Sequence, residues 1–132
     1  MGGRENVPED ISAMIDNVEA RSTHGTYATL AICFNYGGQE EIVRAARRLI
    51  EQHISAEQVT LETVARALDH PEVPPCDLIV RTSGEQRLSD YMLWRAAYSE
   101  FIFLEKYWPE MTADDVTGIL QEYADRNRRF GG

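Results

Sequence analysis

Several features that would assign a protein to a special class are missing from this sequence. Its two cysteines, Cys33 and Cys76, are too few for a disulfide framework and form no Cys-x-x-Cys pair, so we interpret them as buried free thiols in a reducing compartment. No apolar run approaches the roughly 20 residues that a membrane span needs. The opening segment, MGGRENVPED, lacks the apolar stretch of a secretory signal. These absences predict a cytoplasmic protein.

Excess positive charge is also missing. The 22 acidic and 13 basic residues give a net charge of −9, which argues against nucleic acid as a partner because such binding depends on positive charge. Lys106 is the only lysine, and the other basic residues are arginines. Arginine can hold a phosphate group through two parallel hydrogen bonds, so the position of each arginine matters more than the total.

The length and the order of apolar segments predict a fold. With 132 residues, 43% of them hydrophobic, the chain is expected to form a single domain over residues 1–132. Helical periodicity or capping signals predict helices from Pro8 through about residue 18 and at about 39–53, 61–69, 89–98 and 113–128. Continuous apolar runs predict buried strands at 26–36, 77–80 and 101–104. This alternation indicates an α/β fold, a parallel sheet with flanking helices, and three strands make that sheet incomplete.

The segment after the predicted strand 77–80 carries the residues suited to binding an anion. Arg81 and Arg87 lie six residues apart, with hydroxyl residues and a glycine between them, and Ser89 follows. Ligands of open α/β folds bind beyond the carboxyl ends of the strands, and arginines with hydroxyls are suited to a diphosphate. The predicted helix starting near Ser89 would add its positive end. The alternative is a solvated loop whose arginines pair with Glu85 and Asp90.

A single acid marks a candidate metal ligand. Glu100 stands immediately before the apolar run 101–104, and a carboxylate at a strand edge near a phosphate loop suits magnesium. Acids at strand starts are more often structural, and this alternative stays open on the residues alone.

Long stretches of the chain resemble one protein family. Residues 81–103, RTSGEQRLSDYMLWRAAYSEFIF, closely resemble the signature of the cis-prenyltransferases, the undecaprenyl diphosphate synthase family. Residues 35–43, NYGGQEEIV, are similar to another family segment. Trp108-Pro109 and the ending RRFGG at 128–132 also fit the family pattern.

The resemblance implies an activity and roles for particular residues. The family adds isopentenyl diphosphate to an allylic diphosphate with magnesium and makes Z-polyprenyl diphosphates. Arg81, Arg87 and Ser89 would then hold the diphosphate of isopentenyl diphosphate, and Glu100 would be a magnesium ligand. Arg129 and Gly131 match a C-terminal Arg-x-Gly motif that reaches the neighbouring subunit's site, which implies a homodimer.

The departures from the family pattern limit the resemblance to its C-terminal half. Gln39 and Arg95 replace the usual arginine and glutamine, and no Asp-Gly-Asn motif for the allylic diphosphate is present. We therefore expect a chain that supplies the isopentenyl diphosphate half-site, with little turnover alone. A missing N-terminal half would be a second possible partner, and the lipid product implies peripheral membrane contact. The alternative is a non-catalytic accessory or truncated subunit of a prenyltransferase complex.

Overall fold

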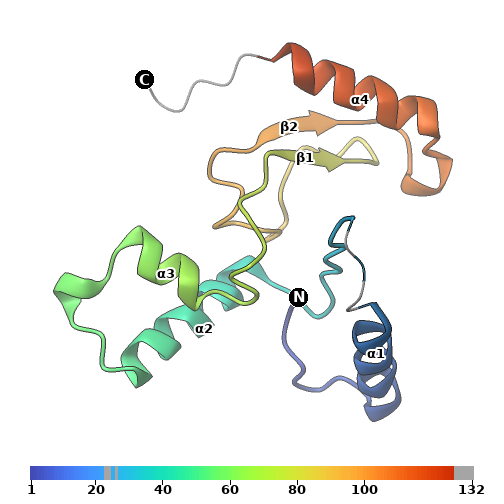
Figure 1. Ribbon diagram of the computed structural model, residues 1–132. Coiled ribbons are helices and arrows are strands. Elements are labelled where there is room, and N and C mark those ends of the chain that lie inside the picture. The colour runs from blue at the N-terminus through green and yellow to red at the C-terminus, as the bar shows by residue number, and fades with distance from the viewer. Residues whose placement is uncertain (23–24, 26, 127–132) are drawn as a thin grey trace. The chain divides into compact units, whose positions relative to one another are not determined.

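The computed structural model of the chain describes residues 1–22, 25 and 27–126. They form two compact units, which we call unit 1 (residues 1–73) and unit 2 (residues 74–132). Helices and a parallel pair of strands are present (Figure 1), so the predicted α/β class with a parallel sheet is confirmed. The expected single domain over residues 1–132 stays a prediction.

Unit 1 is built from helices. They are α1 (Glu9–Ser22), α2 (Gly38–Glu51), the short 3-10 helix η1 (Ala56–Gln58) and α3 (Leu61–Ala67). Thr60 caps α3 as expected, because its side chain accepts a hydrogen bond from the Thr63 backbone N–H at 3.2 Å. The helices α2 and α3 pack against each other (Figure 1) and bury Ala45, Leu49 and Ala67.

The predicted strand at 26–36 is wrong: the described part of it, residues 27–36, contains no strand. Instead the end of this segment lies beside the first residues, where Phe34 N–H donates to the Met1 carbonyl at 2.9 Å. Asn35 then turns the chain with a φ of 48°. Tyr27 and Leu30 are fully or mostly exposed. An apolar run becomes a buried strand only when other strands flank it, and the described residues provide no such ladder.

Unit 2 contains the sheet and one long helix. Strands β1 (Leu78–Arg81) and β2 (Glu100–Phe103) pair in parallel, with Leu78 opposite Glu100 and Arg81 opposite Phe103. The 3-10 helix η2 (Trp108–Glu110) and helix α4 (Ala113–Asp125) follow. Figure 1 shows α4 running alongside β2. Ile79, Ile102 and Ile119 are buried, so both strands and α4 contribute to the small core.

The predicted helix at 89–98 is also wrong, because this segment forms a series of turns. Ser89, Asp90 and Met92 have φ angles of 48°, 67° and 52°, and a right-handed helix cannot pass through such residues. A hydrogen bond connects these turns to the residues just before β1, since the Cys76 N–H donates to the Arg95 carbonyl at 2.9 Å. The positive helix end expected near Ser89 is therefore not present.

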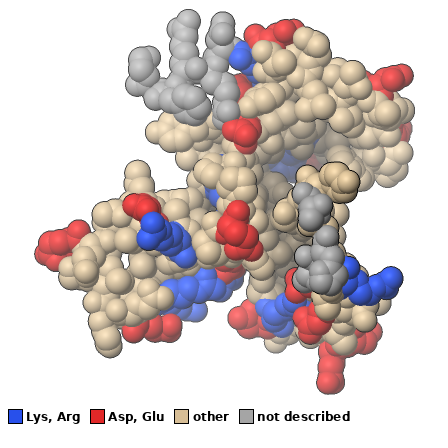
Figure 2. All heavy atoms as spheres, viewed as in Figure 1, with Lys and Arg blue, Asp and Glu red and all other residues tan. Residues whose placement is uncertain are grey.

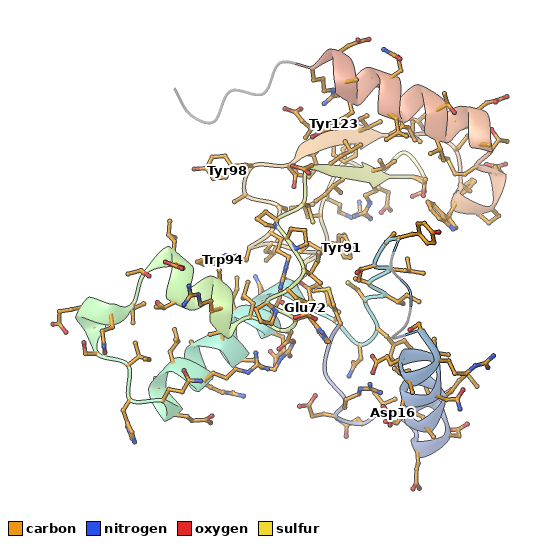
Figure 3. The ribbon with its side chains drawn as sticks, viewed as in Figure 1. Asp16, Glu72, Tyr91, Trp94, Tyr98 and Tyr123 are labelled. Atoms are coloured by element: carbon orange, nitrogen blue, oxygen red, sulfur yellow. The ribbon has the colours of Figure 1, made fainter. Side chains whose placement is uncertain are left out.

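The surface carries charges of both signs. Acidic and basic side chains are interspersed on the face that Figure 2 shows. Tyr98, which Figure 3 shows projecting away from the ribbon of unit 2, is 67% exposed.

No helix among residues 1–22, 25 and 27–126 has the length and apolar character required to cross a membrane.

Candidate anion-binding site

The candidate site begins where β1 ends. Arg81 is the last residue of β1, and its carbonyl accepts from the Leu104 N–H at 2.8 Å, which extends the pairing beyond β2. The chain then leaves the sheet through residues 82–88. This is the carboxyl edge of the parallel pair, the place at which open α/β folds bind ligands.

The loop backbone is held by the segment that follows β2. Ser83 N–H donates to the Lys106 carbonyl at 2.7 Å, and Gly84 N–H donates to the Leu104 carbonyl at 2.8 Å. Gly84 has a φ of 71°, and a Cβ built there would lie 2.6 Å from Glu105 Oε2. Both facts favour glycine, because a side chain would be strained by the backbone angle and crowded by the carboxylate.

Arg81 gathers the loop around its guanidinium. Its Nη1 donates to the Arg87 carbonyl and, at 3.1 Å, to Ser89 Oγ, and its Nη2 donates to Glu85 Oε2. The side chain of Arg81 is 24% exposed. A serine hydroxyl that accepts from arginine still has its own proton to donate, so Ser89 can donate to an anion beside Arg81.

Glu85 joins the two arginines of the loop. One of its carboxylate oxygens pairs with Arg81 and the other with Arg87. Hydrogen bonds from Arg87 and then Arg81 lower the pKa of the Glu85 carboxyl, so it is ionised at neutral pH. Among Arg81, Glu85 and Arg87, the two positive charges exceed the one negative charge, so these three side chains together carry a net charge of +1.

A small hollow of about 190 Å³ lies against these arginines. Ile79, Leu88 and Tyr91 contribute apolar surface to it, and Arg81 and Arg87 line it as well. Figure 3 marks Tyr91 in unit 2. An apolar wall beside two guanidinium groups suits a small molecule with an anionic head and a hydrocarbon body.

Unit 1 contains a larger hollow of about 560 Å³. Arg4, Arg48 and Arg66 line it, and each is already paired with a carboxylate, among them Asp69 and Glu62. Its lining comes from residues 2–71 and includes no strand, whereas ligands of open α/β folds bind at the carboxyl edge of the sheet. Size alone therefore does not make it the better candidate for binding phosphate.

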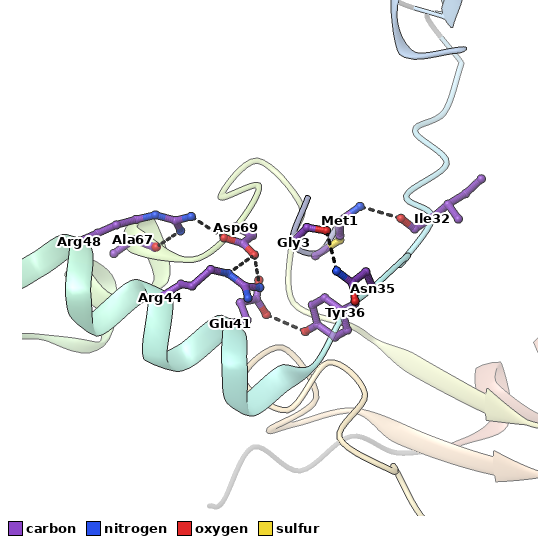
Figure 4. A network of polar contacts seen from close by, with 10 residues as sticks. All are labelled: Met1, Gly3, Ile32, Asn35, Tyr36, Glu41, Arg44, Arg48, Ala67 and Asp69. Carbon is purple, nitrogen blue, oxygen red and sulfur yellow. Dashed lines mark hydrogen bonds and ion pairs between the residues drawn. The ribbon is translucent and has the colours of Figure 1, made fainter. Parts of the chain in front are cut away.

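The most buried ion pairs of unit 1 support the packing of α2 against α3. Asp69, only 9% exposed, accepts from Arg44 Nη2 and from Arg48 Nη2, both at 2.6 Å (Figure 4). Arg48 Nη1 also donates to the Ala67 carbonyl at 2.7 Å. Burial would raise the pKa of the Asp69 carboxyl, but the hydrogen bonds from the two arginines outweigh it and lower the pKa. No motif in the sequence indicates this cluster.

The structure brings together three of the six predicted site residues, Arg81, Arg87 and Ser89. Glu100 opens β2 at the other end of the strand pair, opposite Leu78 rather than Arg81. Three residues of strand separate the two positions, or roughly 10 Å along the sheet. Arg129 and Gly131 lie outside the described residues.

Glu100 is held by a neighbouring arginine. Its Oε2 accepts from Arg126 Nη1 at 3.0 Å, and that nitrogen also donates to the Phe101 carbonyl at 2.9 Å. Arg126 pairs with Glu122 as well, and these carboxylates raise the pKa of its guanidinium. Within the described part of the chain, no three His, Cys, Asp or Glu side chains gather as a metal site would require. Glu100 therefore offers a single carboxylate ligand.

Comparison with known proteins gives a consistent result. Residues 1–131 match a family model described as "Putative undecaprenyl diphosphate synthase". An isoprenyl transferase of Agrobacterium fabrum is 42% identical over 99% of this chain and 55% of its own length. An isoprenyl transferase of Thermotoga maritima is 41% identical over 100% of this chain and 58% of its own length. The chain thus spans about half the length of the curated relatives it matches.

Solved structures agree with these matches. A probable undecaprenyl diphosphate synthase of Campylobacter jejuni superposes with a TM-score of 0.90 at 30% identity, covering 100% of this chain and 61% of that one. Lavandulyl diphosphate synthase of Lavandula x intermedia, solved in complex with dimethylallyl diphosphate, gives a TM-score of 0.90 at 31% identity and covers 100% and 58%.

Proposed function

The chain belongs to the prenyltransferase family of undecaprenyl diphosphate synthases, and from this premise we propose that it supplies the isopentenyl diphosphate half-site of a cis-prenyltransferase. The complete enzyme would condense isopentenyl diphosphate with an allylic diphosphate and form a Z-polyprenyl diphosphate. The observation that carries this proposal is the convergence of Arg81, Arg87 and Ser89 at the carboxyl edge of the sheet.

The proposed role of these residues follows from their donors. Arg81 and Arg87 neutralise the diphosphate and fix its orientation, and Ser89 donates its hydroxyl proton to a phosphate oxygen. A diphosphate held in this way carries its five-carbon chain toward Leu88 and Tyr91, which line the same hollow. Positioning of this kind favours attack by the double bond, because the reacting carbons are held close together.

Magnesium is the cofactor that the family implies, and we propose Glu100 as one ligand. Magnesium is commonly held by one or two carboxylates together with waters and substrate phosphates, so a single glutamate fits this pattern. When bound, the ion would neutralise charge on the departing diphosphate. Glu100 and Arg81 lie at opposite ends of the strand pair. The metal site is therefore proposed to be separate from the Arg81 cluster of the same chain.

The proposed partners follow from the same premise. Arg129 and Gly131, in the family's C-terminal motif, are proposed to reach the site of a neighbouring subunit in a homodimer. An N-terminal portion that binds the allylic diphosphate is the other proposed partner, since the chain covers 55% of the Agrobacterium fabrum relative. We propose a cytoplasmic location, with peripheral membrane contact through the lipid product.

Complementation in trans tests the proposal. The chain is mixed with an N-terminal portion of a relative that carries the Asp-Gly-Asn motif, and labelled isopentenyl diphosphate is followed into a butanol-extractable product. We expect incorporation by the mixture and little by either part alone. Arg87→Ala should reduce incorporation, whereas Arg47→Ala, an exposed arginine of α2, should not. Absence of incorporation by folded, associated parts would contradict the half-site and favour an accessory subunit.

A further inference from the structure

Arg81 and Arg87 are held in unequal ways, although both line the hollow. Arg81 donates to the Arg87 carbonyl, to Ser89 Oγ and to Glu85. The side chain of Arg87 is 60% exposed, and among the residues that the structure describes its guanidinium forms one ion pair, with the carboxylate of Glu85. Arginine has many rotamers, so a side chain with a single contact depends on that contact for its orientation.

Glu85 is placed for this task by the loop backbone. It follows Ser83 and Gly84, whose positive φ angles of 74° and 71° turn the chain and whose N–H groups are anchored to residues 104 and 106. Each carboxylate oxygen of Glu85 faces one arginine. The two guanidinium groups are therefore held at the two oxygens of one carboxylate.

We propose that Glu85 is a positioning residue, which holds the Arg87 guanidinium next to Arg81 so that both can grip one diphosphate. The proposal rests on the diphosphate half-site proposed above and adds a residue that acts through Arg87. The carboxylate also repels an incoming phosphate, but Glu85 is 38% exposed and this repulsion is weakened by solvent. The loss of orientation at Arg87 is expected to be the larger effect.

Affinity for inorganic pyrophosphate, measured by titration calorimetry on the full chain, tests the proposal. Glu85→Gln keeps the size and removes the charge, and Glu85→Asp keeps the charge and shortens the reach. Both should weaken binding, by about tenfold for Glu85→Gln. Glu105→Gln removes an equal charge from a residue near Gly84 and is the control. Tighter binding of pyrophosphate by Glu85→Gln would overturn the proposal, because it would mean that the Glu85 carboxylate competes with the ligand for the two arginines.

A double-mutant cycle identifies the residue through which Glu85 acts. If Glu85 acts through Arg87, then Glu85→Gln combined with Arg87→Ala binds pyrophosphate no more weakly than Arg87→Ala alone. Additive losses would contradict the proposal. Arg87→Lys should not restore the affinity for pyrophosphate that Arg87→Ala loses, because an ammonium group cannot reproduce the planar guanidinium.

A measurement without ligand separates this proposal from the proposed function. The order of the Arg87 side chain is followed by nuclear magnetic resonance at Nε in the free chain. We expect an ordered Arg87 in the unmodified chain, a mobile one in Glu85→Gln and an unchanged one in Glu105→Gln. If the unmodified chain bound no pyrophosphate, the proposed half-site would fail and this comparison would still decide the role of Glu85. An equally ordered Arg87 in Glu85→Gln would refute positioning.

Discussion

Replacement of Asp69 by asparagine should strongly destabilise unit 1. Asp69 is 9% exposed and receives both Arg44 and Arg48, of which Arg44 is 17% exposed. Removing one partner from a fully buried ion pair costs about 3–5 kcal/mol. Arg48 is 41% exposed and can return to water, so we expect a loss of about 2–3 kcal/mol in the free energy of unfolding. In urea this should lower the midpoint by roughly 1–2 M.

The control and the pH dependence make this prediction specific. Glu62→Gln breaks the exposed pair of Glu62 with Arg66 and should change the stability by less than about 0.5 kcal/mol. Because the pKa of the folded Asp69 is lowered from its ordinary value of 3.8, its contribution is complete above that pH and is lost as the pH falls through the folded pKa. The difference between Asp69→Asn and the unmodified chain should therefore shrink below about pH 4. A midpoint for Asp69→Asn equal to that of Glu62→Gln would refute the reasoning.

Two glycines should respond in opposite directions to alanine. Gly84→Ala should destabilise unit 2 by about 1–2 kcal/mol because of its positive φ and the nearby Glu105. Gly118 lies inside α4, and a Cβ added there would have no neighbouring atom within 4 Å. Gly118→Ala should therefore raise the free energy of unfolding by about 0.5–1 kcal/mol. Thermal unfolding of the two variants measures the difference. Thr112→Ala should remove the cap of α4 and cost about 1 kcal/mol in urea unfolding, and an unchanged midpoint would speak against the cap. Lys106 and then Thr112 lower the pKa of Asp115 to about 2, so its stabilising contribution is present above pH 4 and is lost as the pH falls through about 2. Asp115→Asn should remove that acid-sensitive part, as measured by unfolding at pH 7 and pH 2.

The helices that the sequence predicted correctly have signals within their own residues. Pro8 and the acids after it mark the start of α1, and Thr60 and Thr112 cap α3 and α4. Strands β1 and β2 are short apolar runs that pair with each other. These elements were predictable because the information lies within a few residues of each.

The failures lie where structure depends on distant residues. Residues 26–36 have the composition of a buried strand, but burial needs flanking strands that the segment itself does not specify. The helix predicted at 89–98 rested on Ser89 and Asp90 as a helix start, but Ser89, Asp90 and Met92 adopt positive φ angles. The cluster of Asp69 with Arg44 and Arg48 depends on the packing of α2 against α3, which no motif reveals.

The candidate site was partly predictable for the same reason. A motif with arginines six residues apart identified Arg81 and Arg87, and Ser89 followed from the same segment. The bridging position of Glu85 depends on the turn at Ser83 and Gly84, so the sequence indicated a pairing but not its geometry. The separation of Glu100 from Arg81 depends on strand register, which composition does not determine.

The binding of isopentenyl diphosphate to this chain, measured by titration calorimetry, tests the central claim most directly. The account predicts binding by the unmodified chain that is about 10- to 100-fold weaker with Arg81→Ala or Arg87→Ala, the loss expected for a charge-assisted contact. Arg87→Ala is the most informative variant, because Arg87 makes one side-chain ion pair and removing its side chain leaves the contacts of Arg81 in place. Arg47→Ala should bind as the unmodified chain does. Equal affinity in all four proteins, or no binding by the folded chain, would contradict the account.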